Sequence, residues 1–159
     1  AWKEADMILT TGGVSVGEKD LLPGVIENLN GNVLFHGIQV KPGMPTMLSV
    51  VKGTPVLSLS GNPFAVEALF EVLAGSYLTD MEDSRYLQKN QRKVLKQTFV
   101  KTGKMKRIVK GRCDESGVYL PQIQKNGQLK NGIGSNCLVI FPEGERTYAE
   151  GEAVRVIRI

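Results

Sequence analysis

Residue types that bind metals or form cross-links are scarce in this sequence. It contains one histidine and two cysteines. Cys113 and Cys137 belong to no CxxC pair and have no histidine nearby, which argues against a zinc site and a dense disulfide framework. We therefore expect both thiols to be reduced packing residues, as in a cytoplasmic protein.

Long hydrophobic runs are also missing. No stretch approaches the ~20 consecutive apolar residues of a membrane span, and the first six residues lack the apolar core of a secretory signal. We therefore expect no membrane contact. What is present, 42% hydrophobic and 23% charged residues in a chain of 159, is typical of a soluble globular protein with a packed core. The length predicts one domain and a fraction of another.

Charge is divided unevenly along the chain. Residues 1–88 contain 5 basic and 10 acidic side chains, a net charge of −5, whereas residues 89–159 contain 15 basic and 6 acidic ones, a net charge of +9. This change and the polar stretch over 79–84 predict a boundary there, with domains over 1–84 and 85–159.

The basic side chains concentrate in one segment, which we call the basic segment, residues 89–112. It holds ten Lys or Arg and no carboxylate. We interpret it as a solvated face of strands; the sharper alternatives are a surface that steers an anion or one that contacts an acidic partner. Because it lacks the interleaved aromatic residues that stack on bases, we expect no nucleic acid as a partner.

The first half alternates predicted strands with predicted helices. Apolar runs between glycine and proline breaks indicate strands, and apolar residues at helical spacing indicate helices. The expected order is a strand over 6–10, a helix over 21–29, a strand over 32–40, a hairpin of 46–51 with 55–59, and a helix from Pro63 capped by Asn62. This alternation predicts an α/β fold with a parallel sheet.

Helical periodicity does not continue into the second half. Short strand candidates between glycine-containing turns lie over residues 94–100, 106–112, 118–120, 138–141 and 154–159. They predict a small all-β barrel or sandwich.

A glycine-rich loop, TTGGVSVGEKD over residues 10–20, joins the first strand to the first helix. Gly12, Gly13 and Gly17 permit backbone angles that turn several N–H groups into one concavity, which suits phosphate. It is neither a Walker A loop nor a GxGxxG loop. Asp20 is either the N-cap of the helix or an acid that faces the ligand and holds Mg²⁺.

Two further motifs follow strands. Lys41 lies on the proline-bounded turn VKPGMP, where it is either an anion ligand or a solvated lysine. Gly61, Asn62 and Pro63 form a corner that either admits a ligand or only caps a helix. Because strands of an α/β sheet end at one edge, we expect all three motifs to open together there. His36 we interpret as a packed, hydrogen-bonded side chain outside the catalytic set.

At these motifs the sequence resembles the molybdopterin-binding family, and more closely the third and fourth domains of the MoeA type of molybdopterin molybdotransferase, the group that includes the gephyrin E domain. The matching segments are TTGGVSVGEKD at 10–20, FHGIQVKPGMP at 35–45, SLSGNPFAVEAL at 58–69, and NCLVIFPEG followed by AEGEAVRVI. The resemblance implies a MogA-like three-layer α/β domain with a mostly parallel sheet, truncated at its N-terminus, and then a small β barrel.

The resemblance also implies a function. Such proteins bind adenylylated molybdopterin, cleave the adenylate and insert molybdate, assisted by Mg²⁺; homodimers and a MogA-type adenylyltransferase partner are expected. By position, Asp20 and Lys41 would be catalytic and Asp20 would also meet the metal. The residues that would line the cofactor site are Thr11, Gly12, Gly13, Ser15, Gly17, Pro42, Gly43, Gly61, Asn62 and Pro63.

The sequence departs from the family pattern at four positions. Many relatives have a lysine where this chain has Met44 and a proline where it has Ser60, and some have a basic residue in place of Gly37. Relatives often have a serine between two glycines at the counterpart of Asn126. The departures at Met44 and Ser60, together with the role of gephyrin as a receptor scaffold, motivate the alternative of a non-catalytic molybdopterin-binding or scaffolding module.

Overall fold

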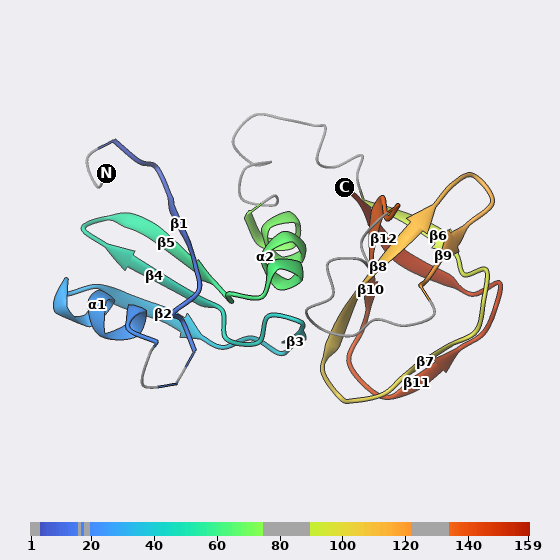
Figure 1. Ribbon diagram of the computed structural model, residues 1–159, viewed down its shortest axis with the longest axis horizontal. Coiled ribbons are helices and arrows are strands. Elements are labelled where there is room, and N and C mark those ends of the chain that lie inside the picture. Colours follow the sequence, from blue (N-terminus) through green and yellow to red (C-terminus); the bar gives the residue numbers. More distant parts are fainter. Residues whose placement is uncertain (1–3, 16, 18–19, 75–89, 122–133) are drawn as a thin grey trace.

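The computed structural model describes residues 4–15, 17, 20–74, 90–121 and 134–159, which form an α/β part and a β-rich part (Figure 1). The first part contains β1 (Ile8–Thr11), α1 (Leu22–Asn28), β2 (Asn32–His36), β3 (Val40–Lys41), β4 (Met47–Val51), β5 (Thr54–Leu59), α2 (Pro63–Leu69) and a π-helical turn, η1 (Phe70–Ala74). The second contains β6 (Asn90–Val94), β7 (Phe99–Lys101), β8 (Lys106–Cys113), β9 (Val118–Tyr119), β10 (Cys137–Phe141), β11 (Arg146–Tyr148) and β12 (Ala153–Arg158). Among these described helices, none is long and apolar enough to cross a membrane.

The first sheet has the order β1-β5-β4-β2. Only β1 and β5 run parallel; β4 pairs antiparallel with both β5 and β2. The expectation of a mostly parallel sheet is therefore wrong for the described strands. The reason is the turn at Lys52 and Gly53, whose φ values of 51° and 83° are those of a two-residue hairpin. The hairpin itself is predictable from the sequence, and a hairpin joins antiparallel strands.

The strand expected over 32–40 is divided between two sheets. β2 ends at His36, Gly37 adopts a φ of 100°, and β3 then pairs parallel with β8 of the second part. The Gly37 N–H donates to the Thr46 carbonyl and the Ile38 N–H to the Met44 carbonyl, so the chain turns back on itself between β2 and β4. A positive φ at Gly37 is what ends β2 and frees β3 to leave the first sheet.

The helices cover different faces of β5. Ile26 of α1 packs with Val56, whereas Leu57 and Leu59 belong to the cluster that contains α2. Because successive strand residues point to opposite faces, α1 and α2 lie on opposite sides of the sheet. Asn62 is the N-cap of α2, as expected: its Oδ1 accepts hydrogen bonds from the N–H groups of Phe64 and Ala65.

The strands of the second part form a sheet in the order β8-β10-β12-β6, which β3 of the first part extends beside β8; β9 also pairs with β8, and β7 and β11 form a separate pair. The prediction of one strand over 94–100 is wrong, because β6 ends at Val94 and β7 begins only at Phe99. There Leu95 forms an isolated bridge to Val118, which links the end of β6 to β9. The sequence pattern does not predict β11, since its first two residues are exposed and show no apolar alternation.

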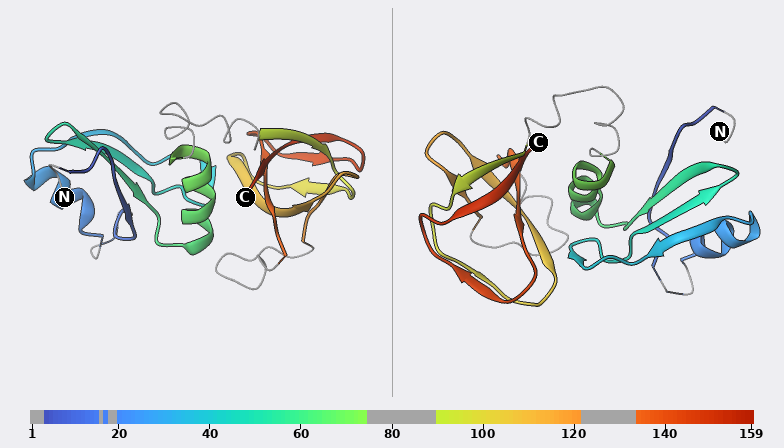
Figure 2. Two further views of the ribbon diagram at one scale, coloured as in Figure 1. Left: turned by 90° about the horizontal axis from the view of Figure 1, so that it is seen from above. Right: turned by 180° about the vertical axis from the view of Figure 1, so that it is seen from behind.

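The two parts share a hydrophobic cluster. Leu59 and Leu69 of the first part pack in the same cluster as Ile108, Leu138 and Ile157 of the second. Figures 1 and 2 show α2 on the side of the first sheet that faces the second part. The expected boundary at residue 84 lies outside the described residues.

Polar contacts of α2 also reach the second part. The Lys110 ammonium lies 2.5 Å from the Glu67 carboxylate and 5.4 Å from the centre of the Phe64 ring. A cation of the basic segment therefore serves to hold α2.

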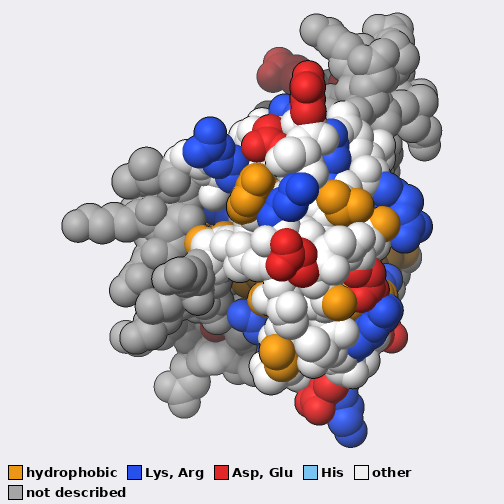
Figure 3. Space-filling model, turned by 90° about the vertical axis from the view of Figure 1, so that its right-hand side faces the viewer, with side chains coloured by type: hydrophobic (Ala, Val, Ile, Leu, Met, Phe, Trp, Pro, Cys, Tyr) orange, Lys and Arg blue, Asp and Glu red, His pale blue; other side chains and the backbone are white. Residues whose placement is uncertain are grey.

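The basic segment is only partly solvated. Lys101 has 1% of its surface exposed, and its Nζ donates to the carbonyls of Gly103 and Gly144 at 2.7 and 2.5 Å. On the face of the second part seen in Figure 3, basic and acidic side chains are interspersed, so this face presents no continuous basic patch.

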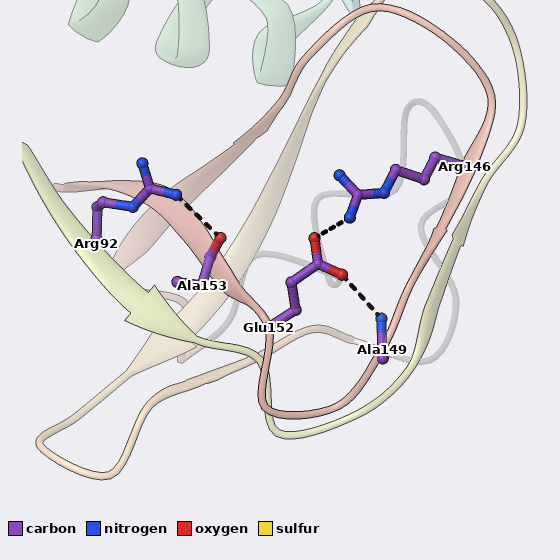
Figure 4. Close-up of polar contacts among 5 residues, drawn as sticks. All are labelled: Arg92, Arg146, Ala149, Glu152 and Ala153. Atoms are coloured by element: carbon purple, nitrogen blue, oxygen red, sulfur yellow. Dashed lines mark hydrogen bonds and ion pairs between the residues drawn. The ribbon is translucent and has the colours of Figure 1, made fainter.

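Arginines of the second part also make structural contacts. Arg146 lies 2.5 Å from one carboxylate oxygen of Glu152, and the other Glu152 oxygen accepts a hydrogen bond from the Ala149 N–H (Figure 4). Arg92 donates to the Ala153 carbonyl at 3.5 Å. These contacts join β6 to β12 and fix the turn before β12.

Both cysteines are buried in one cluster with free thiols, as expected. The pKa of Cys137 is raised from 9.0 to about 12, mainly by burial and secondly by the neighbouring Cys113 thiol. The folded chain thus holds this proton more tightly than the unfolded chain, so stability should fall as the pH rises from about 9 towards 12.

We expect negligible iodoacetamide labelling of Cys137 at pH 8 in the folded chain and rapid labelling in urea, measured by mass spectrometry. Equal labelling rates would contradict this burial.

Candidate functional site

The glycine-rich loop leaves backbone donors unused. Gly12 and Gly13 have φ values of 81° and 65°, which L side chains rarely adopt. The Gly12 N–H donates to the Leu59 carbonyl at 2.9 Å, and the Gly13 carbonyl accepts from Leu22. Within the described part of the chain, the N–H groups of Gly13, Val14 and Ser15 donate to no acceptor. The loop therefore keeps the Gly13 and Ser15 amides available for an anion, whereas Val14 is buried, with 1% of its surface exposed.

Asp20 belongs to this loop and is not the cap of α1. The N-cap is Leu21, which makes no side-chain capping bond. Instead, Asp20 Oδ2 accepts a hydrogen bond of 3.1 Å from the Gly17 N–H, while the Asp20 N–H donates to the Gly17 carbonyl. A Cβ on Gly17 would lie 3.0 Å from that oxygen, so glycine there lets the carboxylate close the loop.

The loop and the Gly-Asn-Pro corner meet, as expected. A Cβ on Gly61 would lie 3.3 Å from the Gly12 Cα, so the two backbones touch. The Ser60 hydroxyl accepts from the Asn62 N–H at 3.3 Å, which steadies the turn into α2. Asn62 acts through its capping oxygen, and Pro63 is the first residue of the helix.

The Lys-Pro-Gly turn reaches the corner through α2 and not through Lys41. A Cβ on Gly43 would lie 2.2 Å from Leu69 Cδ1 and 3.5 Å from the Ala65 Cβ, so the turn packs directly on α2. Lys41 is exposed, and its register partner is Arg107 of β8, in the other sheet. Pro42 follows it through a cis peptide bond. No hydrogen bond among the described residues brings the Lys41 side chain to the glycine-rich loop. Of the three motifs expected to meet, the glycine-rich loop and the Gly-Asn-Pro corner touch through their backbones. The Lys-Pro-Gly turn meets them only indirectly, because Gly43 packs on α2.

His36 contacts the glycine-rich loop. Its Nε2 lies 2.6 Å from the Val14 carbonyl oxygen. The expectation of a hydrogen-bonded histidine is confirmed, but the side chain is exposed and not packed. A partner 22 positions away carries no local sequence signal, which is why the contact could not be predicted.

Buried hydroxyls lie on the strands that end at the site. Thr10 of β1 and Ser58 of β5 are register partners, and neither hydroxyl has a hydrogen-bond partner in the described residues. The Ser49 hydroxyl of β4 is in the same situation, so unpartnered buried hydroxyls are not confined to the strand ends at the site.

Metal-binding side chains do not cluster. In the described ranges, no group of three or more His, Cys, Asp or Glu residues comes together as a metal site. Asp20 is the one acid that the sequence places in the loop within those ranges. Asn126, one of the departures from the family pattern, lies outside the described residues.

Comparison with known proteins agrees with this geometry. A family model described as "Probable molybdopterin binding domain" matches residues 1–80. The molybdopterin molybdenumtransferases of Bacillus subtilis (strain 168) and Staphylococcus aureus (strain COL) are 30% and 28% identical, and the matches cover 100% and 99% of this chain but 38% and 39% of theirs.

The fold has solved counterparts as well. The crystal structure of a molybdopterin biosynthesis MoeA protein from Pyrococcus horikoshii OT3 superposes with a TM-score of 0.75 at 24% identity, covering 100% of this chain and 36% of that one. This chain therefore spans less than two fifths of the length of these relatives. Since the family match covers just over half of the 159 residues, the chain belongs to the molybdopterin-binding domain family, and it is of the MoeA type.

Proposed function

We propose that this chain acts in molybdenum cofactor biosynthesis by binding adenylylated molybdopterin, on which molybdate is inserted with release of AMP. The observation that carries the proposal is the contact of Gly12 with Gly61, beside a loop whose Gly13, Val14 and Ser15 amides have no acceptor among the described residues. Backbone N–H groups at a glycine-rich loop are suited to a phosphate group.

Each part of the loop then has a role. The amides of Gly13 and Ser15 bind phosphate oxygens, Gly12 lets the backbone approach the ligand because it has no Cβ, and Thr11 leads into the loop from the end of β1. Gly17 and Asp20 close the loop on the far side through their mutual hydrogen bonds. Preorganised donors of this kind stabilise charge that develops on phosphate oxygens during cleavage.

The other two motifs form the remaining walls in this proposal. Gly61, with Asn62 and Pro63, faces Gly12 across their backbone contact. Gly43 packs on α2 and Pro42 precedes it in the same turn, and Lys41 contributes positive charge for an anionic substrate such as molybdate.

A single carboxylate is compatible with Mg²⁺ only when the ligand adds oxygens. Mg²⁺ is commonly held by one or two carboxylates together with substrate phosphates, and Asp20 is such a carboxylate next to a phosphate loop. When bound, the ion would neutralise charge on the phosphate oxygens. The second Asp20 oxygen, Oδ1, makes no hydrogen bond within the described ranges, so it remains available as a ligand.

The architecture and context of the protein are part of the proposal. Helices on both faces of β5 support a MogA-like layered domain, and the Leu95–Val118 bridge supports a small β barrel after it. We further propose a homodimer, a MogA-type adenylyltransferase that supplies the substrate, and a cytoplasmic location, where the two buried thiols stay reduced.

Replacing Asp20 with asparagine tests this function. Asparagine keeps an oxygen for the Gly17 N–H and removes the charge, so the fold should persist. We expect Asp20→Asn to lower Mg²⁺-dependent AMP release from adenylylated molybdopterin about hundredfold, within the range of losses seen when one electrostatic group is removed. AMP release and pterin binding are measured by chromatography.

Asp6→Asn is the matched control, because Asp6 is an exposed acid ahead of β1. It should leave both measurements unchanged. Pterin binding without AMP release in the unmodified protein would support the scaffolding module instead. Absence of pterin binding would refute the proposed function altogether.

A further inference from the structure

The His36 side chain holds the middle of the glycine-rich loop. Its Nε2 lies 2.6 Å from the Val14 carbonyl oxygen, across 22 residues of chain. A carbonyl oxygen only accepts hydrogen bonds, so Nε2 carries the proton and donates. Val14 itself is buried, with 1% of its surface exposed.

This bond fixes the orientation of one peptide plane. In a trans peptide the C=O and the following N–H point in opposite directions. Holding the Val14 carbonyl towards β2 therefore aims the Ser15 N–H away from β2, and that N–H has no acceptor among the described residues. Burial of the Val14 side chain fixes its position in the core but not the rotation of the peptide that follows it.

The residues before Val14 cannot supply this restraint. Gly12 and Gly13 are both at positive φ and have no Cβ, so they place no steric restraint on the peptide that follows Val14. The bonds Gly12 N–H to Leu59 and Leu22 N–H to Gly13 fix the first part of the loop, and the Asp20 carboxylate fixes Gly17. Among the described contacts, only that of His36 acts at the Val14–Ser15 peptide.

His36 also connects this loop to the Lys-Pro-Gly turn. Gly37, the next residue, donates its N–H to the Thr46 carbonyl at 2.8 Å. The buried Thr46 hydroxyl in turn donates to the Gly43 carbonyl at 2.7 Å. A short path of hydrogen bonds thus runs from Val14 through His36 to Gly43.

From these contacts we propose that His36 is a positioning residue: it aims the Ser15 N–H at the bound phosphate and sets the glycine-rich loop relative to the Lys-Pro-Gly turn. The ligand in this statement rests on the proposed function, whereas the ordering of the loop does not.

Two substitutions, His36→Phe and His36→Gln, separate the hydrogen bond from the shape of the side chain. Phenylalanine keeps a ring but has no donor, whereas glutamine offers an N–H donor at a similar reach. We expect His36→Phe to lower the ¹⁵N order parameter of the Ser15 amide from about 0.85 to below about 0.6. It should also weaken AMP binding, measured by calorimetry, about five- to tenfold, the value of one ordinary hydrogen bond. His36→Gln should restore the order parameter and keep the AMP dissociation constant within about twofold.

Ser116→Ala is the matched control, since it removes a 2.6 Å hydrogen bond to Asp114 in the turn before β9, in the second part. It should change neither readout. The proposal is overturned if His36→Phe leaves the Ser15 amide ordered, or if His36→Gln fails to restore it. If the unmodified chain binds no AMP, the proposed function is weakened, and the order parameters still decide whether His36 orders the loop.

Discussion

Gly43→Ala is expected to lower the free energy of unfolding by about 2–5 kcal/mol, from backbone strain and overpacking together. Gly43 has a φ of 106°, and an added Cβ would lie 2.2 Å from Leu69 Cδ1 and 3.0 Å from Leu69 Cγ. Leu69 cannot easily give way, because its side chain has no exposed surface and packs among residues of both parts. Urea unfolding followed by circular dichroism measures the loss.

The same substitution should disturb the candidate site. The Cβ would push against α2, whose first turn is capped by Asn62, next to the contact between Gly61 and Gly12. We therefore expect AMP binding to weaken even at temperatures where the variant is still folded.

Gly53→Ala is the matched control for backbone strain. Gly53 also has a positive φ, 83°, but nothing lies within 4 Å of an added Cβ. It should cost only the strain of the left-handed conformation, about 1–2 kcal/mol, and leave AMP binding unchanged. Equal losses in the two variants would show that packing of the Lys-Pro-Gly turn on α2 contributes nothing.

Features that depend on neighbouring residues were predictable from the sequence. The Asn62 cap, Pro63 as first helical residue, the β4–β5 hairpin and the glycine-rich loop after β1 each have a local signature, and the structure contains all of them. Capping and turn chemistry act over two to four residues, so a short window of sequence carries the signal.

Long-range pairings were not predictable in the same way. β3 has two residues, too few to show a period, and its partner β8 begins at Lys106. That pairing moved Lys41 out of the first sheet and made the expected meeting of three strand ends incomplete. Lys101 is a second case: a lysine in a basic segment predicts exposure, but its buried ammonium donates hydrogen bonds to the nearby Gly103 carbonyl and to the Gly144 carbonyl, 43 positions away. The cost of burying that ammonium is offset by contacts that only the folded chain creates.

Leu138→Ala is expected to destabilise the chain by about 3–5 kcal/mol, as buried leucine truncations do when a cavity remains. Leu138 of β10 has no exposed surface and belongs to the cluster that includes Leu69 of α2. If that cluster holds the two parts together, Leu69→Ala and Leu138→Ala should not be additive. Their double-mutant cycle in urea unfolding should give a coupling energy of about 0.5–3 kcal/mol.

Val139→Ala provides the comparison within the same strand. Val139 is equally buried, but as the next residue of β10 it points to the other face and packs in the cluster formed by the second part alone. Its loss of stability should add to that of Leu69→Ala within about 0.5 kcal/mol, as for independent sites. Additivity in both cycles would mean that α2 and β10 are only adjacent. Coupling confined to Leu138 would mean that the second part holds α2 in place. Because the first residues of α2 form the corner beside the glycine-rich loop, the second part would then contribute to ligand binding without touching the ligand.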